Sequence, residues 1–342
     1  METTMLERIR THLAQKRAAL GDWLGASPAD KQAVLLGSSS QAEVRAHLEA
    51  IDTAIEKCEC GELGVCKVCG LSVDDNLLEM DYNADVCIEH LSSEEIDRLE
   101  DELELAKDVQ KALLPQDAPN IPGLDVAAYS RPAAYVGGDY FDFIDFNEET
   151  HGLLIADVAG HGVSASLQMA SLQALTRVII PASDSPAQVV ERIHDLFGHN
   201  IRFDTFVTMF MAAFRPATRM FTYCNAGHNP PIFLQADADQ GSTESWLRPT
   251  GPAVGLVEEP KFSQRSLDLH QGDLVVMYTD GVVEAADHAK NFFGSDHLAE
   301  VVRGLYTSSP REVVRAIRQD LEGFMMGEPP SDDMTLVVCR GT

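Results

Sequence analysis

The sequence predicts an α+β protein: a β-sandwich flanked by helices, preceded by a helical hairpin, a small cysteine-rich module and a linker helix. Residues before position 115 show helical periodicity, whereas short strand-like runs dominate after position 124. Five of the seven cysteines lie between positions 58 and 87. Because the strand-like runs are joined mostly by short turns, they favour a sandwich over a repeating strand–helix–strand array.

The composition of the chain excludes several classes of function. The 342 residues are enough for two or three domains, and the formal net charge of −28 repels nucleic acid phosphates. No apolar stretch is long enough to cross a bilayer, and Met1–Arg10 carries acids without the apolar run of a secretory signal. We therefore expect a cytoplasmic protein that binds neither nucleic acid nor membrane.

Residues 1–57 are expected to form a helical hairpin. Residues 3–24 show apolar positions at helical spacing, and Pro28 marks a break. A second helix is expected from about 40 to 57, with four apolar residues on one face: Val44, Leu48, Ile51 and Ile55. Two helices joined in this way predict a hairpin.

Residues 92–115 are expected to form a linker helix that begins at the capping-box pattern Ser92-x-x-Glu95. Its apolar positions alternate by three and four, with Gln110 as the polar exception: Ile96, Leu99, Leu103, Ala106 and Leu113. Two interpretations stay open: a helix packed on its own domain, or a coiled coil that joins a homodimer through 93–114. Either way, the helix connects the cysteine-rich module to the C-terminal region.

Residues 116–342 are expected to form the sandwich domain, which begins with a Pro- and Gly-containing linker at 116–123. The expected strands are 124–130, 139–146, 152–158, 205–214, 218–224, 273–279 and 334–339. The expected helices are 163–180, 185–198, 296–304 and 310–323. Cys224 and Cys339 lie in apolar runs, so we expect them to be buried thiols.

The cysteine-rich module, 58–91, has the ligand spacing of a zinc site. Cys66 and Cys69 are separated by two residues, and Cys87 and His90 repeat that spacing 17 residues later. Two such pairs suit tetrahedral zinc, and four protein ligands indicate a structural ion. Cys58 and Cys60 are left over as bystanders or as redox-sensitive thiols.

Four short segments place an aspartate at a strand end or in a glycine-rich turn. They are Gly137–Asp142 (GGDYFD), Asp157–Gly162 (DVAGHG), Tyr278–Gly281 (YTDG) and Ser331–Thr335 (SDDMT). Magnesium and manganese prefer carboxylate, carbonyl and water oxygens, and glycine lets the backbone approach an ion. Each segment alone is typical of an ordinary turn. If the four converge, they suit a site for two cations.

The region 100–342 resembles the SpoIIE/RsbU branch of the metal-dependent serine/threonine phosphatases, which are relatives of the type 2C (PPM) phosphatases. The matching motifs are Ala106–Pro115 (AKDVQKALLP), Val136–Asp142 (VGGDYFD), Ile155–Val163 (IADVAGHGV), Thr205–Phe210 (TFVTMF), Asn225–Pro231 (NAGHNPP), Gly272–Gly281 (GDLVVMYTDG) and Asp332–Thr335 (DDMT). The resemblance implies a PPM-type sandwich of two antiparallel sheets, with two manganese or magnesium ions at one end.

The same resemblance implies the metal ligands. They are the side chains of Asp139, Asp157, Asp280 and Asp332 and the backbone carbonyl of Val158. Asp332 is chosen over Asp333 because the first aspartate of its motif matches the family ligand. Asp142 is a weaker candidate, which would act through a water molecule.

The implied chemistry is attack on phosphoserine or phosphothreonine by a water molecule that two cations activate. His161, among glycines, is a candidate for contacting phosphate or acting as an acid. His228 is expected to hold a turn, and Arg131 is expected to be a surface residue at a strand end. By resemblance, the substrate is a phosphorylated STAS-domain anti-sigma factor antagonist in a partner-switching pathway.

The segment Gly61–Gly70 (GELGVCKVCG) resembles the zinc finger of the DksA/TraR family, which also follows a helical hairpin. This sequence departs from that family in having His90 where a fourth cysteine is usual. The resemblance implies an alternative function, a non-enzymatic transcription regulator that binds RNA polymerase through acidic residues at the hairpin tip. Asp22 and Asp30 lie near that tip, but they match the family tip motif poorly.

Overall fold

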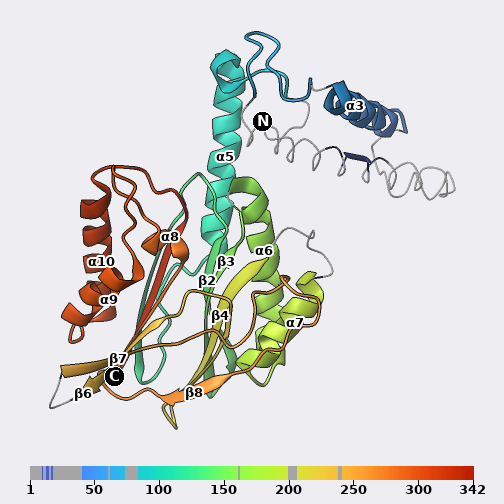
Figure 1. Cartoon of the computed structure of the whole chain (residues 1–342). Coiled ribbons are helices and arrows are strands. Elements are labelled where there is room, and N and C mark those ends of the chain that lie inside the picture. The colour runs from blue at the N-terminus through green and yellow to red at the C-terminus, as the bar shows by residue number, and fades with distance from the viewer. Residues whose placement is uncertain are drawn as a thin grey trace. The chain divides into compact units, whose positions relative to one another are not determined.

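The structure is a computed structural model, and it describes residues 10, 13, 14, 17, 41–60, 62–73, 84–160, 162–198, 206–237 and 241–342. The chain divides into two compact units, Met1–Asp101 and Glu102–Thr342, which are considered separately (Figure 1). Four residues singled out in the sequence lie outside the described residues: Asp22, Pro28, Asp30 and His161. In the described part of the chain, no helix is long and apolar enough to cross a membrane.

The first unit contains α3 (Gln41–Cys60) and the short 3₁₀ helix η1 (Ile88–His90). Of the first predicted helix, only four positions are described, and all four are helical: Arg10, Leu13, Ala14 and Arg17. Leu13 packs against Ile51, Ala54 and Leu63, and Arg17 forms an ion pair with Asp52 at 2.7 Å. These contacts join the described positions of the first segment to α3, and the helical hairpin stays a prediction.

Helix α5 (Ser93–Leu113) crosses the boundary between the two units. It begins with the predicted capping box: the Glu95 carboxylate accepts the Ser92 N–H at 2.9 Å, and the Ser92 hydroxyl accepts the Glu95 N–H at 3.3 Å. The predicted apolar positions and Gln110 are half-buried, and every other position of the helix is exposed. The face identified by periodicity is therefore the one that the protein shields.

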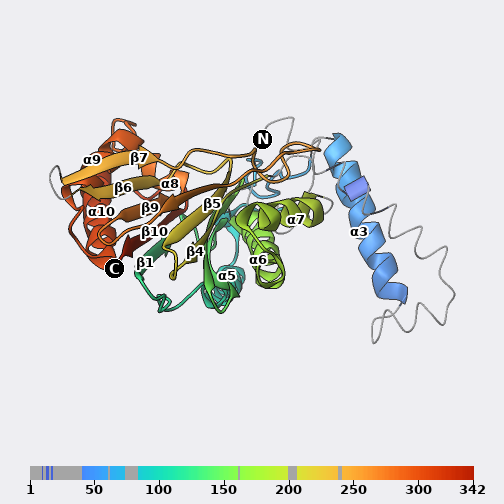
Figure 2. The same cartoon turned by 90° about the horizontal axis from the view of Figure 1, so that it is seen from below.

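The second unit is a sandwich of two five-stranded antiparallel sheets, as predicted (Figures 1 and 2). The order of the first sheet is β1 (Leu124–Arg131), β10 (Met334–Gly341), β9 (Leu274–Tyr278), β6 (Ile232–Asp237) and β7 (Gly241–Trp246). The order of the second sheet is β2 (Asp139–Asn147), β3 (Thr150–Val158), β4 (Val207–Arg215), β5 (Met220–Ala226) and β8 (Arg265–Asp268).

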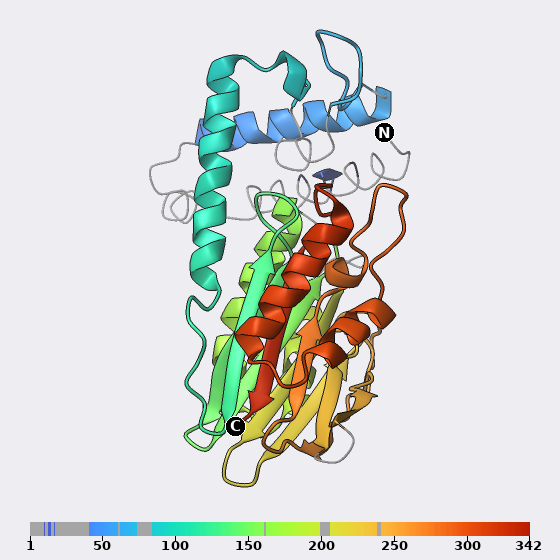
Figure 3. The ribbon, with the colours of Figure 1, turned by 90° about the vertical axis from the view of Figure 1, so that its left-hand side faces the viewer.

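Helices cover the outer face of each sheet (Figure 2). α6 (Gly162–Ile179), the 3₁₀ turn η2 (Ile180–Ala182) and α7 (Pro186–Gly198) pack on the β2–β5 sheet. α8 (Asp280–Val283), α9 (Ser295–Gly304) and α10 (Pro310–Met325) pack on the other sheet, with α10 lying across β1 and β10 (Figure 3). A third apolar layer fills the space between the sheets, so both sheets are buried on both faces.

All strands and long helices expected after position 124 are present. Among the described residues, five short elements were not predicted: β6, β7, β8, α8 and η2. β7 is a polar edge strand and β8 has four residues, none of them buried, so neither shows the apolar alternation that marks a half-buried strand. Cys224 and Cys339 are fully buried, which confirms the expectation for both thiols.

Candidate active site

The four predicted aspartate ligands come in two pairs, one pair from each sheet. Asp139 is the first residue of β2 and lies directly opposite Asp157 of β3 in the antiparallel register. Asp280 follows β9 as the first residue of α8, and Asp332 lies in the turn before β10. The candidate site is therefore built where one end of the first sheet meets one end of the second.

Electrostatics show that these carboxylates share one neighbourhood. Burial, followed by repulsion from Asp280 and Asp332, raises the pKa of Asp157 to about 7. Burial and the Asp157 charge raise the pKa of Asp139 well above its usual range, and burial and Asp332 raise that of Asp280. Ionised carboxylates that repel one another favour a bound cation, so this set of oxygen donors fits magnesium or manganese.

Thr279 links the two pairs directly. Its hydroxyl donates to the Asp139 carboxylate at 2.7 Å and accepts the Thr335 N–H at 2.9 Å. Thr279 lies at the end of β9 and Asp139 lies in the other sheet, so this hydrogen bond crosses the sandwich. It fixes the orientation of the Asp139 carboxylate, which is only 6% exposed.

Asp333 has a different role from Asp332. The Asp333 side chain is 5% exposed, and its two oxygens accept the N–H groups of Ala133 at 2.7 Å and Gly138 at 2.6 Å. It therefore anchors the loop that leads into β2. The half-buried Asp332 accepts the N–H of Asp333 at 2.8 Å through one oxygen. This difference supports Asp332 as the ligand of the pair.

Two glycines allow the backbone to come close at this site. A Cβ on Gly138 would lie 2.7 Å from the Val158 carbonyl oxygen, the predicted backbone ligand. A Cβ on Gly281 would lie 2.1 Å from the carbonyl oxygen of Asp333. Neither position has room for a side chain, which explains why both aspartate motifs contain glycine there.

Comparison with known proteins agrees with this geometry. The sequence model of the family described as Stage II sporulation protein E (SpoIIE) matches residues 147–342, which is more than half of the chain. The chain belongs to the SpoIIE family. Together with the fold, this membership makes it a protein phosphatase by class, as predicted from the sequence.

Two relatives of this SpoIIE-family chain are named phosphoserine phosphatases, both from Bacillus subtilis (strain 168). RsbU is 29% identical over 245 residues, which cover 71% of this chain and 70% of RsbU. RsbP is 30% identical over 187 residues, which cover 54% of this chain and 45% of RsbP. The chain thus spans less than half of the length of RsbP.

Solved structures share the fold. The SiaA-PP2C domain of Pseudomonas aeruginosa superimposes with a TM-score of 0.66 at 20% identity, covering 73% of this chain and 100% of that domain. The RsbU and RsbW domains of Rv1364c from Mycobacterium tuberculosis give a TM-score of 0.55 at 28% identity, covering 65% of this chain and 61% of theirs. The similarity confirms the two-sheet architecture predicted for the C-terminal region.

The suggestion that Asp142 acts at the metal site is wrong. Asp142 lies three residues beyond Asp139 on the same strand, so its side chain points to the opposite face of the sheet. There its carboxylate accepts the Tyr140 hydroxyl at 2.8 Å, the Phe143 N–H at 2.8 Å and the Arg177 guanidinium at 2.9 Å. In this SpoIIE-family chain Asp142 ties β2 to α6.

His228 and Arg131 occupy the structural positions expected from the sequence. His228 is 2% exposed; its N–H donates to the Asn225 side chain at 2.8 Å, and its ring Nδ1 lies 2.8 Å from the Thr208 hydroxyl. Burial lowers the pKa of the His228 imidazole to about 3, which keeps the ring neutral. Arg131 is exposed at the end of β1.

Sequence reasoning missed Glu284. This exposed side chain lies four positions after Asp280, at the C-cap of α8, and its charge contributes to raising the pKa values of Asp157 and Asp280. The spacing would have identified it if the short helix α8 had been predicted, because residues four apart share a helix face.

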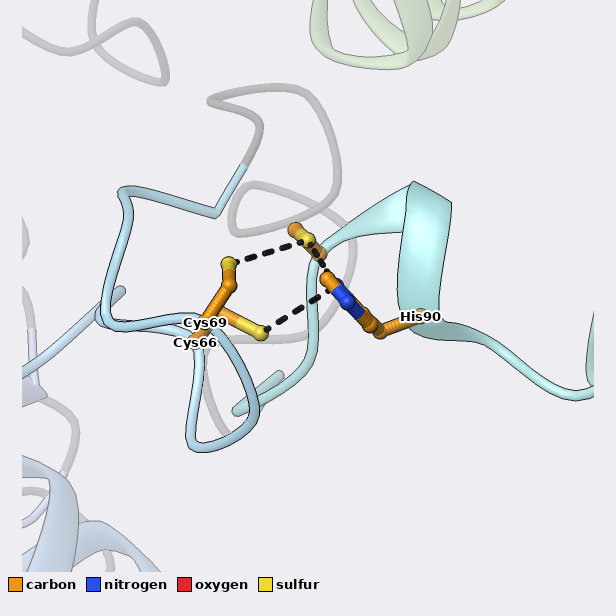
Figure 4. A group of neighbouring side chains, drawn as sticks. Cys66, Cys69 and His90 are labelled. Atoms are coloured by element: carbon orange, nitrogen blue, oxygen red, sulfur yellow. Dashed lines mark hydrogen bonds between the residues drawn. The ribbon is translucent and has the colours of Figure 1, made fainter.

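The predicted zinc ligands lie together in the first unit (Figure 4). The Cys87 sulfur is 3.1 Å from His90 Nδ1 and 3.8 Å from the Cys69 sulfur, and the Cys66 sulfur is 4.0 Å from His90 Nδ1. All four ligand atoms lie within 4.8 Å of one another; in the described residues, no other set of three or more potential ligands is gathered this closely. The wider spread of the aspartates is compatible with two cations instead of one.

The chemistry of the cysteine cluster favours a bound cation. Backbone N–H groups, that of Cys87 foremost, lower the pKa of Cys66 to about 6. Burial and the sulfurs of Cys66 and Cys69 raise the pKa of Cys87 to about 11. A second thiolate is therefore disfavoured until a positive charge is present. Cys58 and Cys60 lie in the last turn of α3, outside the cluster.

Proposed function

We propose that this chain hydrolyses phosphate from phosphoserine or phosphothreonine on another protein, with Asp139, Asp157, Asp280, Asp332 and the Val158 carbonyl as ligands of two divalent cations. The observation that carries the proposal is the meeting of two carboxylates from each sheet, at a place where burial and mutual repulsion raise the pKa values of Asp139, Asp157 and Asp280. Manganese and magnesium are the cations that this donor set suits.

The residues of the chain have two tasks in this proposal. The four carboxylates hold the cations, and Thr279 and Asp333 hold the carboxylates and the loop in place. Bound cations supply Lewis-acid chemistry: they make water a better nucleophile and neutralise phosphate oxygens. Because Asp157 and Asp280 are half-buried and not fully enclosed, a phosphoseryl side chain can reach them from solvent.

The test is release of inorganic phosphate from a phosphoseryl protein by the purified full chain with manganese. We expect turnover that disappears when a chelator is added and returns with manganese or magnesium. A chain that binds manganese but releases no phosphate from any phosphoseryl protein would contradict the proposal. That outcome would favour the second candidate, a non-enzymatic regulator that acts through the N-terminal unit.

For the substrate, we propose a phosphorylated STAS-domain protein of a partner-switching pathway. Support comes from the relatives, two of which are named phosphoserine phosphatases. Dephosphorylation of the phosphorylated STAS proteins of the same organism, compared with an unrelated phosphoseryl protein at equal concentration, tests the choice. Equal rates on both would contradict it.

We also propose that Cys66, Cys69, Cys87 and His90 bind one structural zinc ion. The turn that carries the first two ligands is tight: the Cys66 N–H donates to Leu71 at 2.7 Å, and the Gly70 N–H donates to Cys66 at 2.8 Å. Such turns and four close ligands are typical of structural zinc sites.

For Cys66→Ser combined with Cys69→Ser, we expect zinc content to fall from about one per chain to none, because two ligands cannot retain the ion. Elemental analysis after purification without chelators measures this. Cys58→Ser combined with Cys60→Ser is the matched control and should keep its zinc. Zinc retained in the first variant would contradict the assignment.

The homodimer through 93–114 stays a prediction. Gln110 bonds within its own unit, to the Gly137 carbonyl. The surface left for a second copy is therefore the N-terminal part of the half-buried face of α5, together with the exposed Leu105 and Val109. We expect light scattering to give twice the chain mass at micromolar concentration, and Leu99→Glu with Leu103→Glu to give a monomer. Leu167→Glu, at an exposed position of α6, is the control; a monomeric wild type would refute the prediction.

The choice between the neighbouring aspartates is also testable. Asp332→Asn should weaken manganese binding by about tenfold or more, because it removes a cation ligand. The melting temperature should change little, because Asp332 does not anchor the loop that leads into β2. Asp333→Asn should lower the melting temperature by several degrees, since it weakens two hydrogen bonds to a buried carboxylate. Calorimetric titration and thermal unfolding measure both; the reverse pattern would exchange the two roles.

A further inference from the structure

Gln110 joins the linker helix to the loop that precedes Asp139. Its amide nitrogen donates to the Gly137 carbonyl at 2.6 Å, and its amide oxygen accepts the Gly137 N–H at 3.0 Å. Both backbone groups of one residue are thus bound by one side chain. Gly137 is separated from the predicted ligand Asp139 only by Gly138.

The loop is held equally firmly on its other side. The Asp333 carboxylate accepts the N–H groups of Ala133 and Gly138, and a Cβ on Gly137 would lie 2.1 Å from its Oδ2 atom. The Gly137 backbone is therefore clamped between Gln110 and Asp333. The Asp333 carboxylate fills the space that a side chain at Gly137 would need.

The end of α5 is itself fixed on the second unit. Leu114 packs against two of the apolar layers, and the Gln173 side chain of α6 donates to the Leu113 carbonyl at 3.4 Å. Gln110 lies one turn before this anchor, on the half-buried face of α5, where the other half-buried positions are apolar. A polar side chain at that position is explained by its two hydrogen bonds to Gly137.

We propose that Gln110 is a positioning residue for the cation site: it fixes the Gly137–Gly138 backbone, and through it the Asp139 carboxylate, against the last turns of α5. The inference rests on the proposed function, because Asp139 is a ligand only in that proposal. Loss of the two hydrogen bonds between Gln110 and Gly137 releases the loop on one side and lowers the cation affinity of the site.

The test is manganese affinity of the full chain, measured by calorimetric titration, together with the manganese concentration that gives half-maximal activity. Gln110→Met keeps the length of the side chain and removes both hydrogen bonds. We expect it to weaken manganese binding roughly tenfold, with most activity restored by excess manganese, since two hydrogen bonds of ordinary strength position the loop. Gln110→Glu keeps only the bond from the Gly137 N–H and should also weaken binding.

Gln116→Met is the matched control. The Gln116 side chain donates only to the Lys111 and Leu114 carbonyls at the end of α5, so its loss should leave manganese affinity within twofold of wild type. If Gln110→Met does not fold, the manganese affinity of Gln110→Glu decides whether Gln110 positions the loop.

Unchanged manganese affinity in a folded Gln110 variant overturns the inference, and so does a lower melting temperature without a change in affinity. A wild-type chain that binds manganese but lacks phosphatase activity rejects the proposed function and leaves the Gln110 comparison valid. A wild-type chain that binds no manganese overturns both.

Discussion

In the Asp157→Asn variant we expect kcat/KM for a phosphoseryl protein to fall by about a thousandfold or more, roughly 4 kcal/mol of transition-state stabilisation. The charges of Asp280 and Asp332 both act on Asp157, so its carboxylate is close enough to share a cation with ligands from the other sheet. The same variant should melt at a higher temperature than wild type in the absence of metal at pH 8. The reason is that the mutation removes a carboxylate whose ionisation the fold disfavours.

Asp125→Asn provides the control for this result. Asp125 is an exposed strand aspartate of β1, so its neutralisation should change neither activity nor melting temperature appreciably. Phosphate release assays and thermal unfolding with chelator present measure both quantities. Near-normal turnover in Asp157→Asn would remove Asp157 from the site, and a lower metal-free melting temperature would contradict the charge argument.

Removal of divalent cations should make the stability of the second unit fall as pH rises from about 4 to about 7. Asp157 has a folded pKa of about 7, above its ordinary value of 3.8, so in this interval the folded state binds more protons than the unfolded state. Asp157 therefore contributes its full stabilisation below pH 3.8, and this contribution is lost as the pH approaches about 7. Asp139 and Asp280 shift in the same direction and add to the effect.

Manganese should cancel this dependence, because bound carboxylates stay ionised and no longer repel one another. At about 100 times its dissociation constant, each cation adds about 2.7 kcal/mol to the free energy of unfolding. Denaturant unfolding of the full chain at pH 5 and pH 7.5, with chelator or manganese, measures the difference. Asp157→Asn should show a weaker pH dependence with chelator; metal-free stability that rises over this interval would contradict the prediction.

Local patterns predicted most of the fold. The strands around Asp139 and Asp157, the capping box at Ser92 and the amphipathic helix at 310–323 all have signals within a few residues. Two of the three missed strands lack such signals: β7 is polar, and β8 is a short edge strand without a buried residue. Their positions follow from pairing with β6 and β5, which is a property of the whole sheet. β6 was missed although it contains the buried apolar run Ile232, Phe233 and Leu234.

Of the candidate site, too, the sequence predicted only a part. The glycine-flanked aspartates were recognisable as candidate ligands, but the residues that hold them in place were not. Thr279 bonds to a residue 140 positions away, and Asp333 bonds to Gly138 across 195 positions. No window of sequence contains both partners. Asp142 was misjudged for a local reason, since an odd offset from Asp139 on a strand places it on the other face.

The hydrogen bond between Thr279 and Asp139 joins the two sheets. Cation affinity should therefore report whether the two sheets are packed against each other. Each sheet contributes half of the carboxylates, so neither sheet alone forms the site. A partly folded state that retains both sheets but loosens the apolar layer between them would keep its far-ultraviolet dichroism and lose its affinity for manganese. Loss of metal binding would then precede loss of secondary structure along a denaturant series, and a folding intermediate of this protein would be inactive long before it is unfolded.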